Sequence, residues 1–213
     1  MENIITLSNV SKAYKGKTVV DNVSYEFEKG RCCGIIGHNG CGKSVLMKLI
    51  AGFAYPDTGE IRINGRLLKK DMDFIPDAGV IINSPEFINS MSGYNNLKYL
   101  AEINKKASDQ KILETLEWLG LKDAMKKRVS TYSVGMKQRL RLAQAIMDDP
   151  DTLILDEPMN GLDKDGVGEV REYLLALKQQ GKTILLSSHS AEDIDVLCDT
   201  VVEMDKGKLE KIR

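Results

Sequence analysis

Apolar and polar residues alternate along the first third of the chain, as they do in half-buried strands. The alternation runs over residues 4–10 and 19–27, and a shorter version over 60–64 ends before Gly65. Residues 31–36 instead form a nearly unbroken apolar run, which is typical of a strand buried on both faces. We therefore predict an antiparallel β layer beside a buried central strand.

The pattern changes to that of amphipathic helices further along the chain. Apolar residues recur at helical spacing over 94–104, and Ser108 is placed to cap a second helix that Gly120 closes. No strand pattern interrupts residues 84–132. We predict that this stretch is a helical subdomain inserted into a single domain, whose core consists of residues 1–83 and 133–213.

Strands and helices alternate in the rest of the core. Ser133 caps a predicted helix that extends to about residue 147, and Lys206-Gly207 predicts a hairpin between 201–204 and 208–212. This alternation indicates an α/β fold with a largely parallel sheet and helices on both faces. The other predicted helices are 43–53, 166–180 and 191–198, and the other predicted strands are 80–82, 152–155 and 183–187.

Composition narrows the class of protein. The chain has 213 residues, of which 42% are hydrophobic and 29% charged, as expected of a soluble globular protein. Its formal net charge of −1, without a basic stripe, argues against a nucleic-acid partner. No apolar run approaches the roughly 18 residues that a membrane-spanning helix needs. The four cysteines have neither disulfide nor zinc spacing, which favours a reducing compartment.

The segment from Gly37 to Ser44 fits the phosphate-binding pattern G-x-x-x-x-G-K-[ST] and lies between a predicted strand and helix. Glycines let the backbone turn its N–H groups inward, and the helix N-terminus completes an anion site. We expect Lys43 to contact the β- and γ-phosphates and Ser44 to bind Mg²⁺. We also expect these surroundings to favour a reactive Cys41 thiolate, although a small residue tolerated at a variable loop position would equally explain Cys41. The predicted nucleotide-binding residues of this segment are Gly37, His38, Asn39, Gly40, Cys41, Gly42, Lys43, Ser44 and Val45.

Two further apolar strands end in residues with catalytic chemistry. Asp156 and Glu157 follow the run 152–155, and in a phosphate-loop enzyme an Asp in this place holds Mg²⁺. Glu157 is then placed to accept a proton from the attacking water. His189 ends the run 184–188 and can donate a hydrogen bond to the γ-phosphate. Taken alone, an acidic turn and a structural histidine would explain these residues, but the phosphate loop favours catalytic roles.

The segment Tyr132-Ser133-Val134-Gly135-Met136-Lys137-Gln138-Arg139 opens a predicted helix, where a hydroxyl and a glycine backbone can bind an anion. By itself this is an ordinary capped helix start. The chain resembles the ATP-binding cassette (ABC) ATPases over essentially its whole length. The resemblance rests on five motifs that occur in the family's order: the phosphate loop, this segment, Leu-Asp-Glu-Pro, Gly161-Leu162-Asp163 and Ser-Ser-His. The family's usual Leu-Ser-Gly-Gly-Gln is replaced at residues 132–136, in a form similar to bacitracin- and lantibiotic-export-type ATP-binding subunits.

The resemblance implies a phosphate-loop NTPase that uses ATP and Mg²⁺. It implies that Tyr14 stacks on adenine, although a tyrosine at a sheet edge would also explain this residue, and that Lys43, Glu157 and His189 are catalytic. It also implies that Ser133 and Gly135 contact the γ-phosphate of a nucleotide bound to another copy, with Asp163 at the dimer interface. The implied partners are a second identical subunit, joined on ATP binding, and a separate integral membrane permease.

The implied location is cytoplasmic, on the inner face of the cell membrane, and export is favoured over import. One alternative is a soluble ABC ATPase that acts on ribosomes or nucleic acid. The single cassette, short helical insertion and slightly acidic charge count against it. A regulatory cassette with poor turnover is a further alternative, which the Glu157 and His189 pair disfavours.

One position departs from the family pattern. The family usually has Gln at the end of the strand before the helical insertion, whereas this chain has Asn83, whose side chain is one methylene shorter. We therefore predict that Asn83 contacts the nucleotide site indirectly, through a water or through loop position. We expect Asn83, Pro85, Glu86 and an exposed Phe87 to form a hinge and a docking groove for the permease, although packing within the helical subdomain would also explain Phe87.

Overall fold

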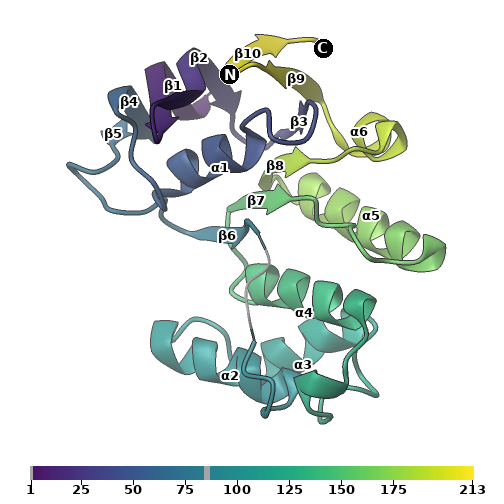
Figure 1. Cartoon of the computed structure of the whole chain (residues 1–213). Helices are drawn as coiled ribbons and strands as arrows, with labels where there is room; N and C mark the ends of the chain where they lie inside the picture. The colour runs from purple at the N-terminus through teal and green to yellow at the C-terminus, as the bar shows by residue number, and fades with distance from the viewer. Residues whose placement is uncertain (1, 84–86) are drawn as a thin grey trace.

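A computed structural model describes residues 2–83 and 87–213, and the predicted hinge residues Pro85 and Glu86 lie outside this part. Within it the chain forms two sheets and the helices α1 to α6 (Figure 1). The α/β class and the N-terminal antiparallel layer are confirmed. None of the helices in the described ranges has the length and hydrophobicity needed to cross a bilayer.

The antiparallel sheet has the strand order β2-β1-β4-β5. Strands β1 and β2 are longer than predicted, because bulges interrupt the register near residues 7–13 and put the alternation out of phase. They continue to a tight turn at Lys15 and Gly16, both with positive φ. The strands are β1 (Asn3–Tyr14), β2 (Lys17–Glu28), β4 (Thr58–Ile63) and β5 (Arg66–Leu67).

The second sheet has the order β10-β9-β3-β8-β7-β6 and is parallel except for β10, which closes the predicted hairpin. Because its strands are parallel, the carboxyl ends of β3, β7 and β8 meet at one edge. Those ends carry the phosphate loop, Asp156 and the segment before His189. The strands are β3 (Cys32–Ile36), β6 (Ala78–Ile81), β7 (Thr152–Asp156), β8 (Thr183–Ser187), β9 (Thr200–Asp205) and β10 (Lys208–Lys211).

Both faces of the parallel sheet are buried, which explains the unbroken apolar runs of its strands. On β7, Ile154 packs in the core shared with α1 and the antiparallel sheet, while Leu153 and Leu155 pack in the core shared with the other helices. Figure 1 shows α1 lying between the two sheets. The helices are α1 (Lys43–Ala51), α2 (Gly93–Asn104), α3 (Asp109–Trp118), α4 (Val134–Ile146), α5 (Lys164–Gln179) and α6 (Ala191–Leu197).

Two helix boundaries differ from the prediction because of their caps. Helix α1 ends two residues early, since Gly52 adopts φ 85° at its C-cap. Helix α5 begins two residues early, since the Asp163 carboxylate caps it by accepting a hydrogen bond from Gly166 N at 2.9 Å. Helices α2 and α3 share one apolar core with α4 and α5. Subdomain boundaries at residues 84 and 132 therefore stay a prediction.

Candidate active site

The phosphate loop is shaped by two glycines that no other residue could replace without strain. Gly37 has φ 142°, and a Cβ there would lie 2.3 Å from the Met204 carbonyl oxygen. Gly42 has φ 119°, and a Cβ there would lie 2.7 Å from the Val19 carbonyl oxygen. The loop is thereby pressed against β9 and β2. Gly42 is also the N-cap of α1, so the unpaired N–H groups at the start of that helix face the loop.

Lys43 holds its ammonium group inside this loop. The residue is 7% exposed, and Nζ donates hydrogen bonds to the carbonyl oxygens of Gly37 at 2.6 Å and His38 at 3.3 Å. A positive charge beside the N-terminus of α1 favours a bound anion. The Lys43 ammonium and the N-terminus of α1 can therefore bind phosphate groups together.

Asp156 lies between two hydroxyl groups that orient its carboxylate. Ser44 Oγ donates to Asp156 Oδ2 at 2.5 Å, and Ser187 Oγ donates to Oδ1 at 2.6 Å. Carboxylate and hydroxyl oxygens are the ligands that Mg²⁺ prefers, together with phosphate oxygens and water. The described residues contain no cluster of three or more acidic, His or Cys side chains that would bind a metal alone. The Asp156 carboxylate and the Ser44 hydroxyl therefore fit two positions around a magnesium ion.

Glu157 has the properties of a proton acceptor. Burial raises the pKa of its carboxyl above the ordinary 4.5, while His189 and Lys43 act in the opposite direction. Its Oε1 lies 3.1 Å from His189 Nε2, within ion-pair distance, yet has no hydrogen-bond partner among the described residues. The backbone has a φ of 51°, and its N–H donates to Ser187 Oγ at 3.0 Å. A partly buried carboxylate with an oxygen that lacks a hydrogen-bond partner can take a proton from water.

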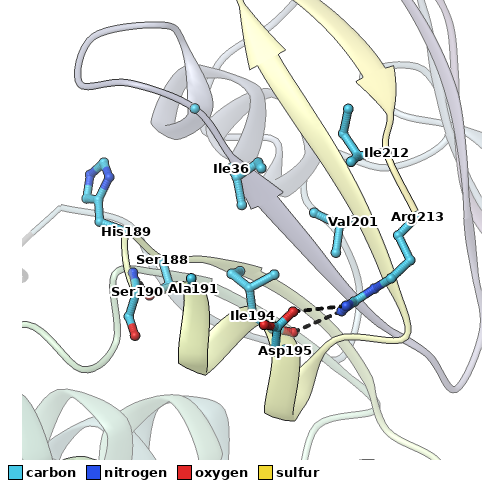
Figure 2. A pocket seen from close by; sticks show the side chains of 11 residues that line it. Ile36, Ser188, His189, Ser190, Ala191, Ile194, Asp195, Val201, Ile212 and Arg213 are labelled. Carbon is cyan, nitrogen blue, oxygen red and sulfur yellow. Dashed lines mark hydrogen bonds and ion pairs between the residues drawn. The ribbon is translucent and has the colours of Figure 1, made fainter.

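One cavity of about 220 Å³ brings most of the predicted residues together. Val19 and Ser187 were missed by the sequence reasoning, although Ser187 belongs to the Ser-Ser-His run that singled out His189. His189 also borders a second cavity of about 390 Å³, at the opposite end from the Asp195–Arg213 ion pair (Figure 2). The first cavity is lined by Val19, Asn39, Gly40, Gly42, Lys43, Ser44, Val45, Asp156, Glu157 and His189.

Eight predicted residues do not line this cavity: Tyr14, Gly37, His38, Cys41, Asn83, Ser133, Gly135 and Asp163. Ser133 caps α4, with Oγ accepting a hydrogen bond from Met136 N at 3.1 Å, and it is exposed. Tyr14 is 45% exposed, with the Lys12 ammonium 5.4 Å from its ring centre. In a single copy of the chain, Tyr14 and Ser133 thus lie outside the lining of the cavity that holds Lys43.

The structure contradicts two expectations about side-chain exposure. Cys41 is only 4% exposed and belongs to the core between the sheets, so it is not an accessible thiol. Phe87 is partly buried against the helical core, which supports the packing explanation, whereas the next residue, Ile88, is 46% exposed. Asn83 is exposed and has φ 61°.

Comparison with known proteins agrees with this arrangement. The ABC transporter family profile matches residues 20–160. The ABC transporter ATP-binding protein YybJ of Bacillus subtilis is 44% identical, covering 97% of this chain and 95% of the relative. The bacitracin transport ATP-binding protein BcrA of Enterococcus faecalis is 39% identical (98% and 68%), and the lantibiotic transport ATP-binding protein SrtF of Streptococcus pyogenes is 36% identical (97% and 89%).

Solved structures match over nearly the whole fold. The ATP-binding subunit of an ABC transporter superposes with a TM-score of 0.88 at 26% identity, covering 98% of this chain and 89% of the other. A dimeric ATP-binding cassette with ADP and Pi also has a TM-score of 0.88, at 21% identity and 99% coverage of both chains. The chain therefore belongs to the ABC transporter family and is one of its transport-coupled, ATP-binding ATPases.

Proposed function

We propose that this chain works as a homodimer on the cytoplasmic side of a separate membrane permease. Two molecules of ATP with Mg²⁺ would be bound between the copies, and their hydrolysis would drive export of a peptide antibiotic of the bacitracin or lantibiotic class. The cargo is supported by the names of two relatives, the bacitracin transport protein BcrA and the lantibiotic transport protein SrtF. Export is proposed from the resemblance of residues 132–136 to export-type ATP-binding subunits.

The observation that carries the dimer is the division of the predicted nucleotide ligands between two places. Lys43, Ser44 and Glu157 line one cavity, whereas the exposed Ser133 and the neighbouring Gly135 lie elsewhere, at the start of α4. A second copy related by a two-fold axis would place its Ser133 against the phosphates held by Lys43 of the first. Each complete site would then need both copies.

Within such a site the residues divide the chemistry of phosphoryl transfer. Lys43 and the N-terminus of α1 bind the β- and γ-phosphates, and His189 holds the γ-phosphate by a hydrogen bond. Ser44 and Asp156 would hold Mg²⁺, which when bound neutralises phosphate charge. Glu157 takes the proton of the attacking water at its unpaired Oε1. Tyr14 would supply a stacking surface for adenine.

An apolar surface beside β6 supports a permease partner. A cavity of about 340 Å³ there is lined by Phe53, Leu100 and Ile103 and also by polar residues, among them the ion pair of Asp77 and Lys106; Phe53 is 57% and Ile103 65% exposed. Phe74, also 57% exposed, extends the surface with its ring 6.0 Å from that of Phe53. We assign this surface to an apolar helix of the permease. Ile103→Asp should block co-purification with the permease and spare the isolated ATPase. Ile212→Asp, at an exposed position near the C-terminus, should leave both co-purification and ATPase activity unchanged.

A complementation experiment tests the composite site. Lys43→Ala and Ser133→Arg each inactivate both sites of their own homodimer. In a mixed dimer, however, one site has neither substitution. Mixing the two proteins with ATP should therefore give mixed dimers joined at the one intact site, whereas neither protein alone should form an ATP-dependent dimer; a pull-down through a tag on one of them measures this. If no mixed dimer forms while both proteins stay folded and the wild type does dimerise with ATP, Ser133 acts within its own chain or not at all, and the proposed site is wrong.

A further inference from the structure

Gln138 connects the helix that begins at Ser133 to the backbone of the catalytic carboxylate. It lies on α4 and is only 4% exposed. Its Nε2 donates a hydrogen bond to the Pro158 carbonyl oxygen at 2.7 Å and lies 3.5 Å from the Glu157 carbonyl oxygen. A side chain of α4 thus holds the peptide groups that directly follow Glu157.

The orientation of the Gln138 amide is fixed from its other end. Arg141, one turn further along α4, donates from Nη1 to Gln138 Oε1 at 2.9 Å. Two carbonyl acceptors on one side and a guanidinium donor on the other leave a single arrangement of the amide, with its N–H groups toward residues 157 and 158. A shift of α4 therefore carries the Gln138 amide and its hydrogen bond to the Pro158 carbonyl with it.

Glu157 needs outside contacts to hold its backbone. A φ of 51° is unfavourable for a residue with a Cβ, and persists only where surrounding groups fix it. Ser187 fixes the Glu157 N–H from β8, and Gln138 fixes the following carbonyl groups from α4. The position of the proton acceptor is thus determined by two elements far from it in sequence.

We propose that Gln138 is a positioning residue that couples the two ATP sites of the dimer. This proposal rests on the proposed dimer, in which Ser133 contacts ATP held by the partner. Ser133 and Gln138 are five residues apart, about 7.5 Å along one rigid helix. When ATP bound by the partner draws in Ser133, α4 moves as a unit, and Gln138 brings Glu157 into place in the site of its own copy.

The near-isosteric variant Gln138→Met removes this contact while keeping the buried volume. We expect kcat for ATP to fall on the order of 10- to 100-fold, since displacing a reacting group by about 1 Å has effects of this size. The KM should change less than about twofold, because no phosphate ligand is lost. The Hill coefficient should fall to 1. Gln138→Glu, which keeps an acceptor for Arg141 but loses the donor to Pro158, should show the same kcat and KM split.

Two controls separate positioning from general stability. Gln110→Met, on the exposed surface of α3, removes an amide hydrogen bond to Glu114 and should leave kcat and cooperativity unchanged. In a Glu157→Gln background, Gln138→Met should lower the residual turnover no further, because it acts through the missing carboxylate. A lower melting temperature with unchanged kcat and Hill coefficient, or additive losses in the double variant, would overturn the proposal. Failure of Lys43→Ala and Ser133→Arg to form a mixed dimer with ATP would instead refute the composite site itself.

Discussion

Gly79 is the point at which β6 and α4 touch, and enlarging it should separate them. A Cβ on Gly79 would lie 1.9 Å from the Ala145 carbonyl oxygen of α4 and 2.8 Å from Leu153 Cδ2 of β7. Because the first contact is with helix backbone, no rotamer change relieves it, and α4 has to retreat by roughly 1 Å. Gly79→Ala should therefore destabilise the fold by at least about 1–3 kcal/mol, the usual range for an overpacked core.

The matched substitution Gly168→Ala should have the opposite effect on the stability of the fold. A Cβ at Gly168, inside α5, meets nothing within 4 Å, so Ala should stabilise by about 0.5–1 kcal/mol through helix propensity. Thermal unfolding followed by circular dichroism should resolve the stability changes of both variants, because the melting temperature of a chain of this length shifts by about 2–4 °C per kcal/mol. ATPase activity should fall only in Gly79→Ala, because α4 carries Ser133 and Gln138. If both variants melt at the wild-type temperature, the contact between β6 and α4 described here is wrong.

Three further predictions concern the site. Glu157→Gln should lower kcat by about 10²–10⁴-fold and trap an ATP-bound dimer visible by size exclusion; near-normal turnover would remove Glu157 from the base role. Because burial raises the pKa of Glu157 above 4.5, its ionised form destabilises the fold at pH values above that raised pKa, and the penalty disappears as pH falls from there to 4.5. Glu157→Gln should therefore melt higher than wild type at pH 7 but not below pH 4.5, and an equal gain at both would contradict the assignment. All four thiols, Cys41 included, are buried and should react with a bulky maleimide only after unfolding; rapid labelling of the native protein would exclude this.

The parts of the fold that follow from local pattern could be predicted from the sequence. Residues 183–187 and 152–155 are apolar runs because both faces of the parallel sheet are covered, and the phosphate loop is defined by glycine spacing within eight residues. The parallel order then brings the carboxyl ends of β3, β7 and β8 together. The grouping of Lys43, Asp156 and Glu157 follows from that rule alone.

Features that depend on contacts between distant segments could not be predicted. The burial of Cys41 depends on how the loop packs between the two sheets, which its local sequence does not indicate. Val19 reaches the cavity because the register of β2 carries it there. Gln138 looked like an ordinary polar residue near a helix start, and its contact with Pro158 joins positions 20 residues apart.

Glu157 shows why local rules fail where the chemistry is concentrated. Its left-handed backbone would suit glycine or asparagine, and its burial would suit an apolar side chain, yet the chain has a carboxylate there. The left-handed backbone and the burial of a carboxylate both lower the stability of the fold, and contacts from β8 and α4 hold Glu157 in place. Catalysis benefits from both, because a partly desolvated carboxylate with an unpaired oxygen is a stronger proton acceptor than a solvated one. The segments that sustain this arrangement, around Ser187 and Gln138, are therefore the places where a substitution can reduce turnover without touching the nucleotide.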